Sequence, residues 1–120
     1  MTPEEIVQFA EDAHASCDVE RIMKCFEDNI VASWNGRAIA SSKAELRVWY
    51  HKFFDSQKSF KLKKTLRAAQ GNMIAVEWQH ERTAADGQRF EAWAAEIWWM
   101  SDANRLEQWH AHCTEYPLEE

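Results

Sequence analysis

The sequence predicts an α+β fold in which N-terminal helices pack against a curved sheet of long strands. Apolar residues recur with helical spacing in the first half of the chain, and the period changes to two after residue 56. Only three Gly and two Pro occur in 120 residues, which argues against a loop-rich chain. Helices followed by antiparallel strands with short turns form an α+β arrangement. We expect an antiparallel or mixed sheet that wraps around the helices as a cone-shaped barrel and leaves a cavity between them.

The first helix is predicted over residues 3–15. Thr2 and Glu5 form a capping box at its start, with Pro3 at the first helical position. Its apolar positions follow i, i+3, i+4, i+7 spacing. Asp18 is predicted to cap a second, short helix. The apolar side of that second helix consists of Val19, Ile22, Met23 and Phe26.

A short strand and a third helix complete the first half of the chain. Ile30–Trp34 is rich in residues that favour strands and stops at the turn dipeptide Asn35-Gly36. Ser42 and Glu45 form a second capping box, which begins a helix predicted over 43–56.

The second half of the chain predicts four strands joined by short turns. In the first, Phe60, Leu62, Leu66 and Ala68 alternate with Lys61, Lys63, Thr65 and Arg67. The other three are expected over residues 73–83, 88–100 and 106–116, with turns at 70–72, 84–87 and 101–105.

Length, charge and cysteine count limit the class of protein. One hundred and twenty residues are expected to form one domain, residues 1–120. The net charge of −6 opposes binding to nucleic acid, and no apolar stretch approaches the ~20 residues of a membrane span. Three cysteines without CxxC spacing argue against disulfides or zinc. The acidic N-terminus does not resemble a signal peptide, so a cytoplasmic location is expected.

Strand register decides which side chains share a face of the sheet. If Asp86-Gly87 makes a three-residue hairpin loop, Trp78 lies opposite Ala94 and Val76 opposite Glu96. The turn at 101–105 is then expected to place Glu96 opposite His110. One face would carry Trp78, His80, Glu96, Trp98, His110, His112 and Thr114. The other face would carry Trp93, Ile97, Trp99, Trp109, Ala111 and Cys113. If the helices covered this second, apolar face, the candidate site would have to be reassigned.

Glu96 and His110 are the predicted catalytic pair. A carboxylate in a Trp-lined cavity next to an imidazole can transfer a proton near neutral pH, which suits isomerisation, dehydration or cyclisation through an enol. Alternatively, the two side chains only satisfy one another, or water, on a half-exposed sheet surface, or they anchor a ligand. His14 and His51 are expected on solvated helix faces.

The seven Trp residues either build a heavy core or line a pocket for a flat, apolar molecule. The predicted ligand-binding residues are Trp34, Trp78, His80, Trp98 and His112. His110 and His112 alternate along one strand and could bind a metal together with Glu96 or His80, but i, i+2 histidines often occur by chance. We therefore expect no metal and no cofactor.

Three short motifs resemble the nuclear-transport-factor-2-like superfamily. They are a Gly-Asn-x-Ile-Ala-Val strand at Gly71–Val76, a Gly-Gln-x-Phe turn at Gly87–Phe90 and a Glu-x-Trp strand at Glu96–Trp98. The resemblance extends to Val31–Trp34 and to the closing Tyr116-Pro117, and is strongest to small SnoaL-like proteins of unknown function. It implies a cystatin-like α+β barrel and a homodimer. The Asp-based sites of the superfamily's ketosteroid isomerases and epoxide hydrolases have no counterpart here, because the predicted strands contain almost no Asp.

Three function classes remain open at this stage. The chain is expected to be a cavity enzyme of the isomerase, dehydratase or cyclase kind, a non-catalytic binder of a small apolar ligand, or a dimerisation module with a closed core. An open cavity with a polar pair favours the first class and a cavity without one favours the second, whereas a filled interior excludes both.

Overall fold

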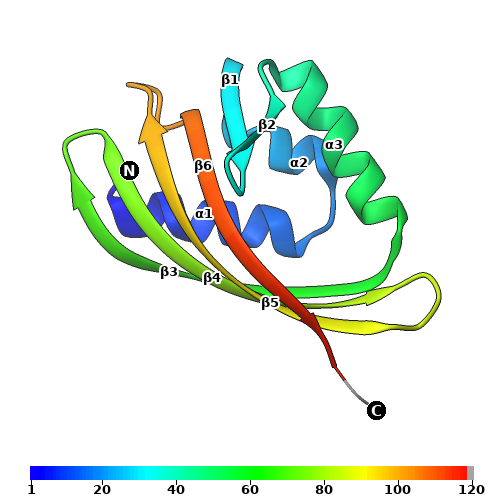
Figure 1. Cartoon of the computed structure of the whole chain (residues 1–120). Helices are drawn as coiled ribbons and strands as arrows, with labels where there is room; N and C mark the ends of the chain where they lie inside the picture. The colour runs from blue at the N-terminus through cyan, green and yellow to red at the C-terminus, as the bar shows by residue number, and fades with distance from the viewer. Residues whose placement is uncertain (119–120) are drawn as a thin grey trace.

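The computed structural model describes residues 1–118 and confirms the α+β fold. Within residues 1–118, two helices come before the first strand and a third separates the second strand from the third, in one six-stranded sheet of order β2-β1-β6-β5-β4-β3. The helices are α1 (Pro3–Ala15), α2 (Val19–Met23) and α3 (Lys43–Asp55). The strands are β1 (Phe26–Trp34), β2 (Arg37–Ala40), β3 (Gln57–Gln70), β4 (Met73–Ala84), β5 (Arg89–Met100) and β6 (Leu106–Pro117). Long, bent strands form a concave surface that α1 and α3 cross (Figure 1).

The predicted N-caps of the three helices are confirmed, but of the two predicted capping boxes only the first is complete. Thr2 and Glu5 exchange the two hydrogen bonds of a capping box, and the Asp18 side chain accepts from the backbone amide of Arg21. The Ser42 hydroxyl accepts from the amide of Glu45 at the start of α3. No helix within residues 1–118 is long and apolar enough to span a membrane.

Strand β2 was not among the predicted elements. Asn35 and Gly36 both have positive φ, 51° and 81°, and turn the chain so that β2 pairs back on β1. On its other side β1 pairs parallel to β6, while all other neighbouring strands are antiparallel. The sheet is therefore mixed.

The hairpin between β4 and β5 has the predicted register. Trp78 pairs with Ala94 and Val76 with Glu96. Gly87 adopts φ 92°, and the amide of Ala84 donates to the carbonyl of Gln88 at 2.9 Å, which closes a three-residue loop.

The predicted register between β5 and β6 is wrong by one residue, because β6 contains a bulge. Met100 pairs with Leu106, but Trp99 pairs with Gln108, so Glu107 is an extra residue between the two pairs. Glu96 therefore lies opposite Ala111, and His110 lies opposite Ile97. A shift of one residue exchanges the two faces of a strand. The bulge turns Trp109 inward and His110 outward.

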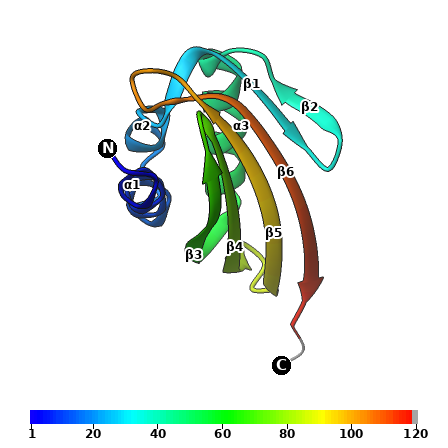
Figure 2. The same cartoon turned by 90° about the vertical axis from the view of Figure 1, so that its left-hand side faces the viewer.

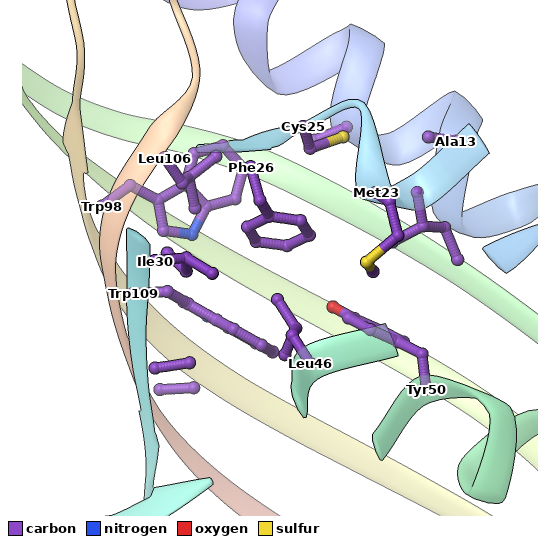
Figure 3. Close-up of a cluster of buried hydrophobic side chains, with 14 of the residues drawn as sticks. Ala13, Met23, Cys25, Phe26, Ile30, Leu46, Tyr50, Trp98, Leu106 and Trp109 are labelled. Carbon is purple, nitrogen blue, oxygen red and sulfur yellow. The ribbon is translucent and has the colours of Figure 1, made fainter. Parts of the chain in front are cut away.

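The helices cover the face of the sheet that carries Glu96. The core between the helices and the sheet includes Phe26, Leu46, Trp98 and Trp109, whose side chains lie close together in Figure 3. Figure 2 shows all three helices on one side of the curved sheet. Trp93, Ile97 and Trp99 of β5 point to the opposite, outer face, where Trp93 is exposed.

His14 does not lie on a solvated helix face, which corrects a second expectation. Its Nδ1 lies 2.7 Å from the carbonyl oxygen of Ala10, and its Nε2 lies 2.8 Å from the hydroxyl of Tyr50. The imidazole therefore links α1 to α3. Burial, together with the nearby positive charge of Lys64, lowers the pKa of His14 to about 3.

Lowering the pH should destabilise the fold through His14. Its folded pKa of about 3 lies below the ordinary histidine value of 6.5, which the unfolded chain has. Between these values the unfolded state binds more protons than the folded state, so the free energy of unfolding falls as pH is lowered through this window. One such histidine contributes a slope of about 1.4 kcal/mol per pH unit. We expect His14→Gln to remove this slope, measured by urea unfolding between pH 4 and pH 7.

The matched control is His51→Gln, because His51 is exposed on α3. This variant should keep the wild-type dependence of unfolding free energy on pH. Parallel pH profiles for wild type and His14→Gln would show that His14 is not held neutral by the fold.

Candidate functional site

A cavity of about 320 Å³ lies between α3 and the concave face of the sheet. Helix α3 contributes Trp49, Tyr50, Phe53 and Phe54 to its wall. The strands contribute Trp34, Phe60, Leu62, Trp78 and Trp109. Ligand sites typically occupy roughly 300–1,000 Å³ and combine an apolar wall with a few polar groups. The cavity has the size and the lining of a site for a small molecule.

Aromatic rings in the wall support each other across elements. Trp34 of β1 lies 5.7 Å from Trp49 of α3 and 6.0 Å from Trp78 of β4, measured between ring centroids. Tyr50 stacks on Trp109 of β6 at 6.2 Å with an interplanar angle of 6°. Such packing holds flat surfaces at defined positions, which favours a flat, apolar occupant.

The inner end of the cavity is a buried ion pair. Glu96 is 2% exposed and Lys64 9% exposed, and Lys64 Nζ lies 3.5 Å from Glu96 Oε1. The indole N–H of Trp98 donates to Glu96 Oε1 at 2.9 Å, and the indole N–H of Trp78 donates to Oε2. Removing one partner from such a buried pair typically costs about 3–5 kcal/mol. Glu96 is thus a fully partnered carboxylate and not a free base.

Lys64 points inward because it has the same phase as Leu62, which also lines the cavity, on the alternating strand β3. β3 is the last strand of the sheet, and Lys64 pairs with Trp78 of β4. The backbone N–H of Lys64 is not used by β4; it donates to the carboxylate of Glu11 on α1 at 2.7 Å. Helix α1 thereby covers the exposed edge of β3 at this residue.

A second polar group lies nearer the mouth, where the lining includes exposed Ser56 and half-buried Gln57. Arg82 donates two hydrogen bonds to Glu115, at 3.0 and 2.5 Å. Hydrogen bonding from Arg82 lowers the pKa of Glu115. His80 is 4% exposed, and its Nε2 lies 3.6 Å from Glu115 Oε2.

His80 is a neutral imidazole without a hydrogen-bond partner among residues 1–118. Its ring packs on Trp78 at 4.5 Å and on Phe60 at 5.0 Å between centroids. This burial lowers the pKa of His80 to about 4, and the charge of Glu115 offsets part of the effect. The nearby carboxylate favours a proton on Nε2, which leaves the Nδ1 lone pair unused.

The hydroxyl oxygen of Tyr50 can only accept a further hydrogen bond, because its own proton is donated to His14. Nδ1 of His14 faces a carbonyl oxygen and must donate, so Nε2 of the neutral ring accepts the hydroxyl proton of Tyr50. Burial raises the pKa of Tyr50 well above its usual value, and the charge of Glu96 adds to the effect. Tyr50 therefore remains a phenol that points its proton at His14.

The structure separates the predicted catalytic pair. Glu96 lies on the inner face, whereas His110 lies on the outer face with its ring 4.8 Å from Trp99. His112 pairs with Ala95 and also points outward, exposed. The expectation that Glu96 and His110 are neighbours is wrong, and so is the alternative metal set, because the two faces are separated by the sheet. Among residues 1–118 no cluster of three potential metal ligands is found.

The other candidate residues lie on the inner face. Trp34, Trp78 and His80 line the cavity, and Trp98 lies behind its inner end, where it hydrogen-bonds Glu96. Lys64 was missed as a site residue because it belongs to a run of lysines. The signal was available: Lys64 has the same phase as Leu62 and Leu66 in an alternating strand. His14, Arg82 and Glu115 gave no such signal.

The cavity combines three kinds of group that proton-transfer chemistry uses. His80 provides a basic nitrogen, Glu115 can stabilise the imidazolium that forms, and Lys64 provides a charged hydrogen-bond donor at the other end. Two cations, Lys64 and Arg82, balance two carboxylates, Glu96 and Glu115. The lining is neutral overall.

Solved structures of other proteins share this fold. The epoxide hydrolase/cyclase-like enzyme SalBIII, described for pyran ring formation in the polyether salinomycin, is 17% identical, with a TM-score of 0.84 over 97% of this chain and 95% of that chain. An NTF2-like protein of unknown function from Burkholderia pseudomallei is 13% identical, with a TM-score of 0.79 over 93% and 91% of the two chains. A computationally designed 17-OHP binder is 11% identical, with a TM-score of 0.81 over 97% and 98%.

These similarities confirm the expected nuclear-transport-factor-2-like fold, and at such low identity they show the fold alone. No protein of curated function matches the sequence. Over residues 1–120 the sequence matches the family described as protein of unknown function DUF1348. The chain therefore belongs to the DUF1348 family.

Proposed function

We propose that this protein binds a small, neutral, mostly apolar molecule in the cavity between α3 and the sheet. The observation that carries the proposal is the cavity itself, with about 320 Å³ enclosed by aromatic side chains from four strands and one helix. An apolar surface of this kind favours a flat ring system. The balanced charges of its lining favour a neutral ligand over an ion.

We further propose that the site transfers a proton, using His80 as the base and Glu115 as its carboxylate partner. This pair replaces the Glu96–His110 pair expected from the sequence. Support comes from the buried, neutral imidazole of His80 and its 3.6 Å approach to Glu115. Isomerisation, dehydration and cyclisation all require such a transfer. The similarity in fold to an epoxide hydrolase/cyclase-like enzyme is consistent with this class.

Non-catalytic binding is the second candidate function. It is favoured by the designed 17-OHP binder, which has the same fold and is described only as a binder. The two candidates share the cavity and differ in whether His80 exchanges a proton with the ligand. A dimerisation module with a closed core does not fit the open volume beside α3.

We also propose the homodimer that the family resemblance implies, formed through the outer face of the sheet. Exposed Trp93 lies there, next to half-buried Ile97 and Trp99. Sedimentation equilibrium should then give twice the 14.1 kDa chain mass, and Trp93→Glu should give the single-chain mass. A wild-type protein that sediments as a monomer would contradict the proposal.

Filling the cavity should abolish binding of an apolar probe. We expect 2-isopropenylnaphthalene to quench tryptophan fluorescence of the wild type, because Trp34, Trp49, Trp78 and Trp109 line the cavity. Leu62→Trp places a large ring in the same space and should weaken binding by about tenfold or more, equivalent to about 1.4 kcal/mol.

The matched control is Trp93→Phe on the outer face, which should bind the probe like the wild type. Circular dichroism checks that both variants are folded. Equal affinity of the wild type and Leu62→Trp would place the probe outside the cavity and contradict the binding proposal.

Proton transfer can be tested without knowing the natural ligand. In D₂O, 2-acetylnaphthalene exchanges its methyl protons through the enol, and NMR measures the rate. The wild type should accelerate this exchange, and His80→Gln should lose about 10²–10⁴-fold of the acceleration. Because the neutral ring is the base, the rate should rise with pH through about 4 and then level off.

His112→Gln is the control, since His112 lies on the outer face. It should exchange the probe at the wild-type rate. If His80→Gln binds 2-acetylnaphthalene normally and also exchanges it at the wild-type rate, non-catalytic binding becomes the better description of the site.

A further inference from the structure

Lys64 is a buried ammonium with unused hydrogen-bonding capacity. Its side chain is 4% exposed, and it lines the cavity. Its Nζ lies 5.2 Å from the ring centroid of Trp78 and 5.5 Å from that of Trp98. The contact with Glu96 Oε1 is 3.5 Å, longer than the roughly 2.7–2.9 Å of a charge-assisted hydrogen bond. A lysine ammonium has three donors, and this contact engages at most one of them weakly.

We propose that Lys64 binds a neutral oxygen of the ligand, a carbonyl or an ether, at the inner end of the cavity. This proposal deepens the proposed binding function and rests on it. It assigns a substrate class: a flat, apolar molecule that carries an oxygen acceptor and no negative charge.

Apart from Trp109, the other polar groups at this end cannot replace Lys64 as donor. The indole N–H groups of Trp78 and Trp98 are used by Glu96. The hydroxyl proton of Tyr50 is used by His14. The remaining candidate is the indole N–H of Trp109, which is buried without a partner among residues 1–118. The experiment below distinguishes it from Lys64.

The class of acceptor follows from the charge beside Lys64. A ligand carboxylate at this place would approach Lys64 but also lie close to Glu96, and the two negative charges would repel each other. A carbonyl or ether oxygen accepts a hydrogen bond without adding charge. The ion pair is therefore suited to a neutral acceptor.

This position also assigns Lys64 a role in the proposed proton transfer. When His80 takes a proton from the carbon next to a carbonyl, the C–H electron pair forms a C=C bond. The carbonyl π electrons move to oxygen, where the Lys64 ammonium donates to the developing enolate. Return of the proton from imidazolium to carbon restores the base, so no co-reactant is needed.

Two probes of the same shape test the proposal. In 2-isopropenylnaphthalene a CH₂ group replaces the carbonyl oxygen of 2-acetylnaphthalene. A carbonyl that enters an apolar cavity without a donor loses its hydrogen bonds to water. With Lys64 as donor, the wild type should bind the ketone about 10- to 100-fold more tightly than the alkene. The infrared carbonyl stretch of the bound ketone should also shift to lower frequency than in hexane.

Substitutions then identify the donor. Lys64→Met should bind the alkene more tightly than the ketone, and the carbonyl stretch should return to its value in hexane. Lys63→Met, at the exposed neighbouring position, and Trp109→Phe should retain the wild-type preference. If Lys64→Met does not fold, the affinity ratio and the infrared shift of the wild type still decide whether a donor faces the ligand.

Each failure has a separate signature. If neither probe binds to the wild type, the proposed binding function fails. If both bind equally, the cavity binds apolar molecules but Lys64 does not bind their oxygen, and the inference is overturned. It is also overturned if 2-naphthoate binds more tightly than the ketone, or if Trp109→Phe, and not Lys64→Met, loses the preference.

Discussion

The burial of the Glu96 carboxylate is the constraint on which the concave side of this protein depends. A carboxylate removed from water is strongly destabilising unless donors and a counter-charge replace its hydration. Three neighbouring strands supply them: Lys64 from β3, Trp78 from β4 and Trp98 from β5, the strand of Glu96 itself. A slip of one residue in either hairpin would move a donor to the other face. The buried charge thus helps to specify the registers of β3, β4 and β5.

A cavity lies beside a large hydrophobic core on the concave side of the sheet. Phe26, Leu46 and Trp98 belong to this core, and Figure 3 shows their side chains close together. Beside this core, Trp49 of α3 packs edge to face against Trp109 of β6, and the cavity lies next to these rings. The polar groups lie at the two ends of this space, with Lys64 and Glu96 inside and Arg82 and Glu115 near the mouth. A ligand would therefore be oriented by polar contacts at its two ends and held by aromatic packing against its flat faces.

Proteins with different descriptions, an epoxide hydrolase/cyclase-like enzyme and a designed 17-OHP binder among them, share the fold of this chain. The relatives that share the fold are at most 17% identical among those compared, so their chemistry does not transfer residue by residue. What this chain contributes is a lysine–glutamate pair clamped by two indoles and a histidine–glutamate–arginine group. The proposed ligand binding and proton transfer rest on these groups and not on the fold.

Local signals in the sequence predicted the three helices, five of the six described strands and one register. The capping box at Thr2, the N-cap at Ser42 and the loop at Asp86-Gly87 each act within about four residues, so they are visible without tertiary contacts. The α+β class followed from the change of period. The inner positions of Trp78, His80 and Glu96 on β4 and β5 followed from the same hairpin register.

Only the tertiary structure decided where the histidines lie and which lysine is buried. The bulge at Glu107 allows both Leu106 and Trp109 to face the helices, and it sends His110 outward. His14 and Lys64 are buried because α1 crosses α3 and the edge of β3, contacts between residues 36 and 53 positions apart. The sequence by itself determined the features that depend on residues close together along the chain, such as helix caps and the hairpin loop. The site depended on which face the helices cover, because distant side chains meet only after that packing is complete.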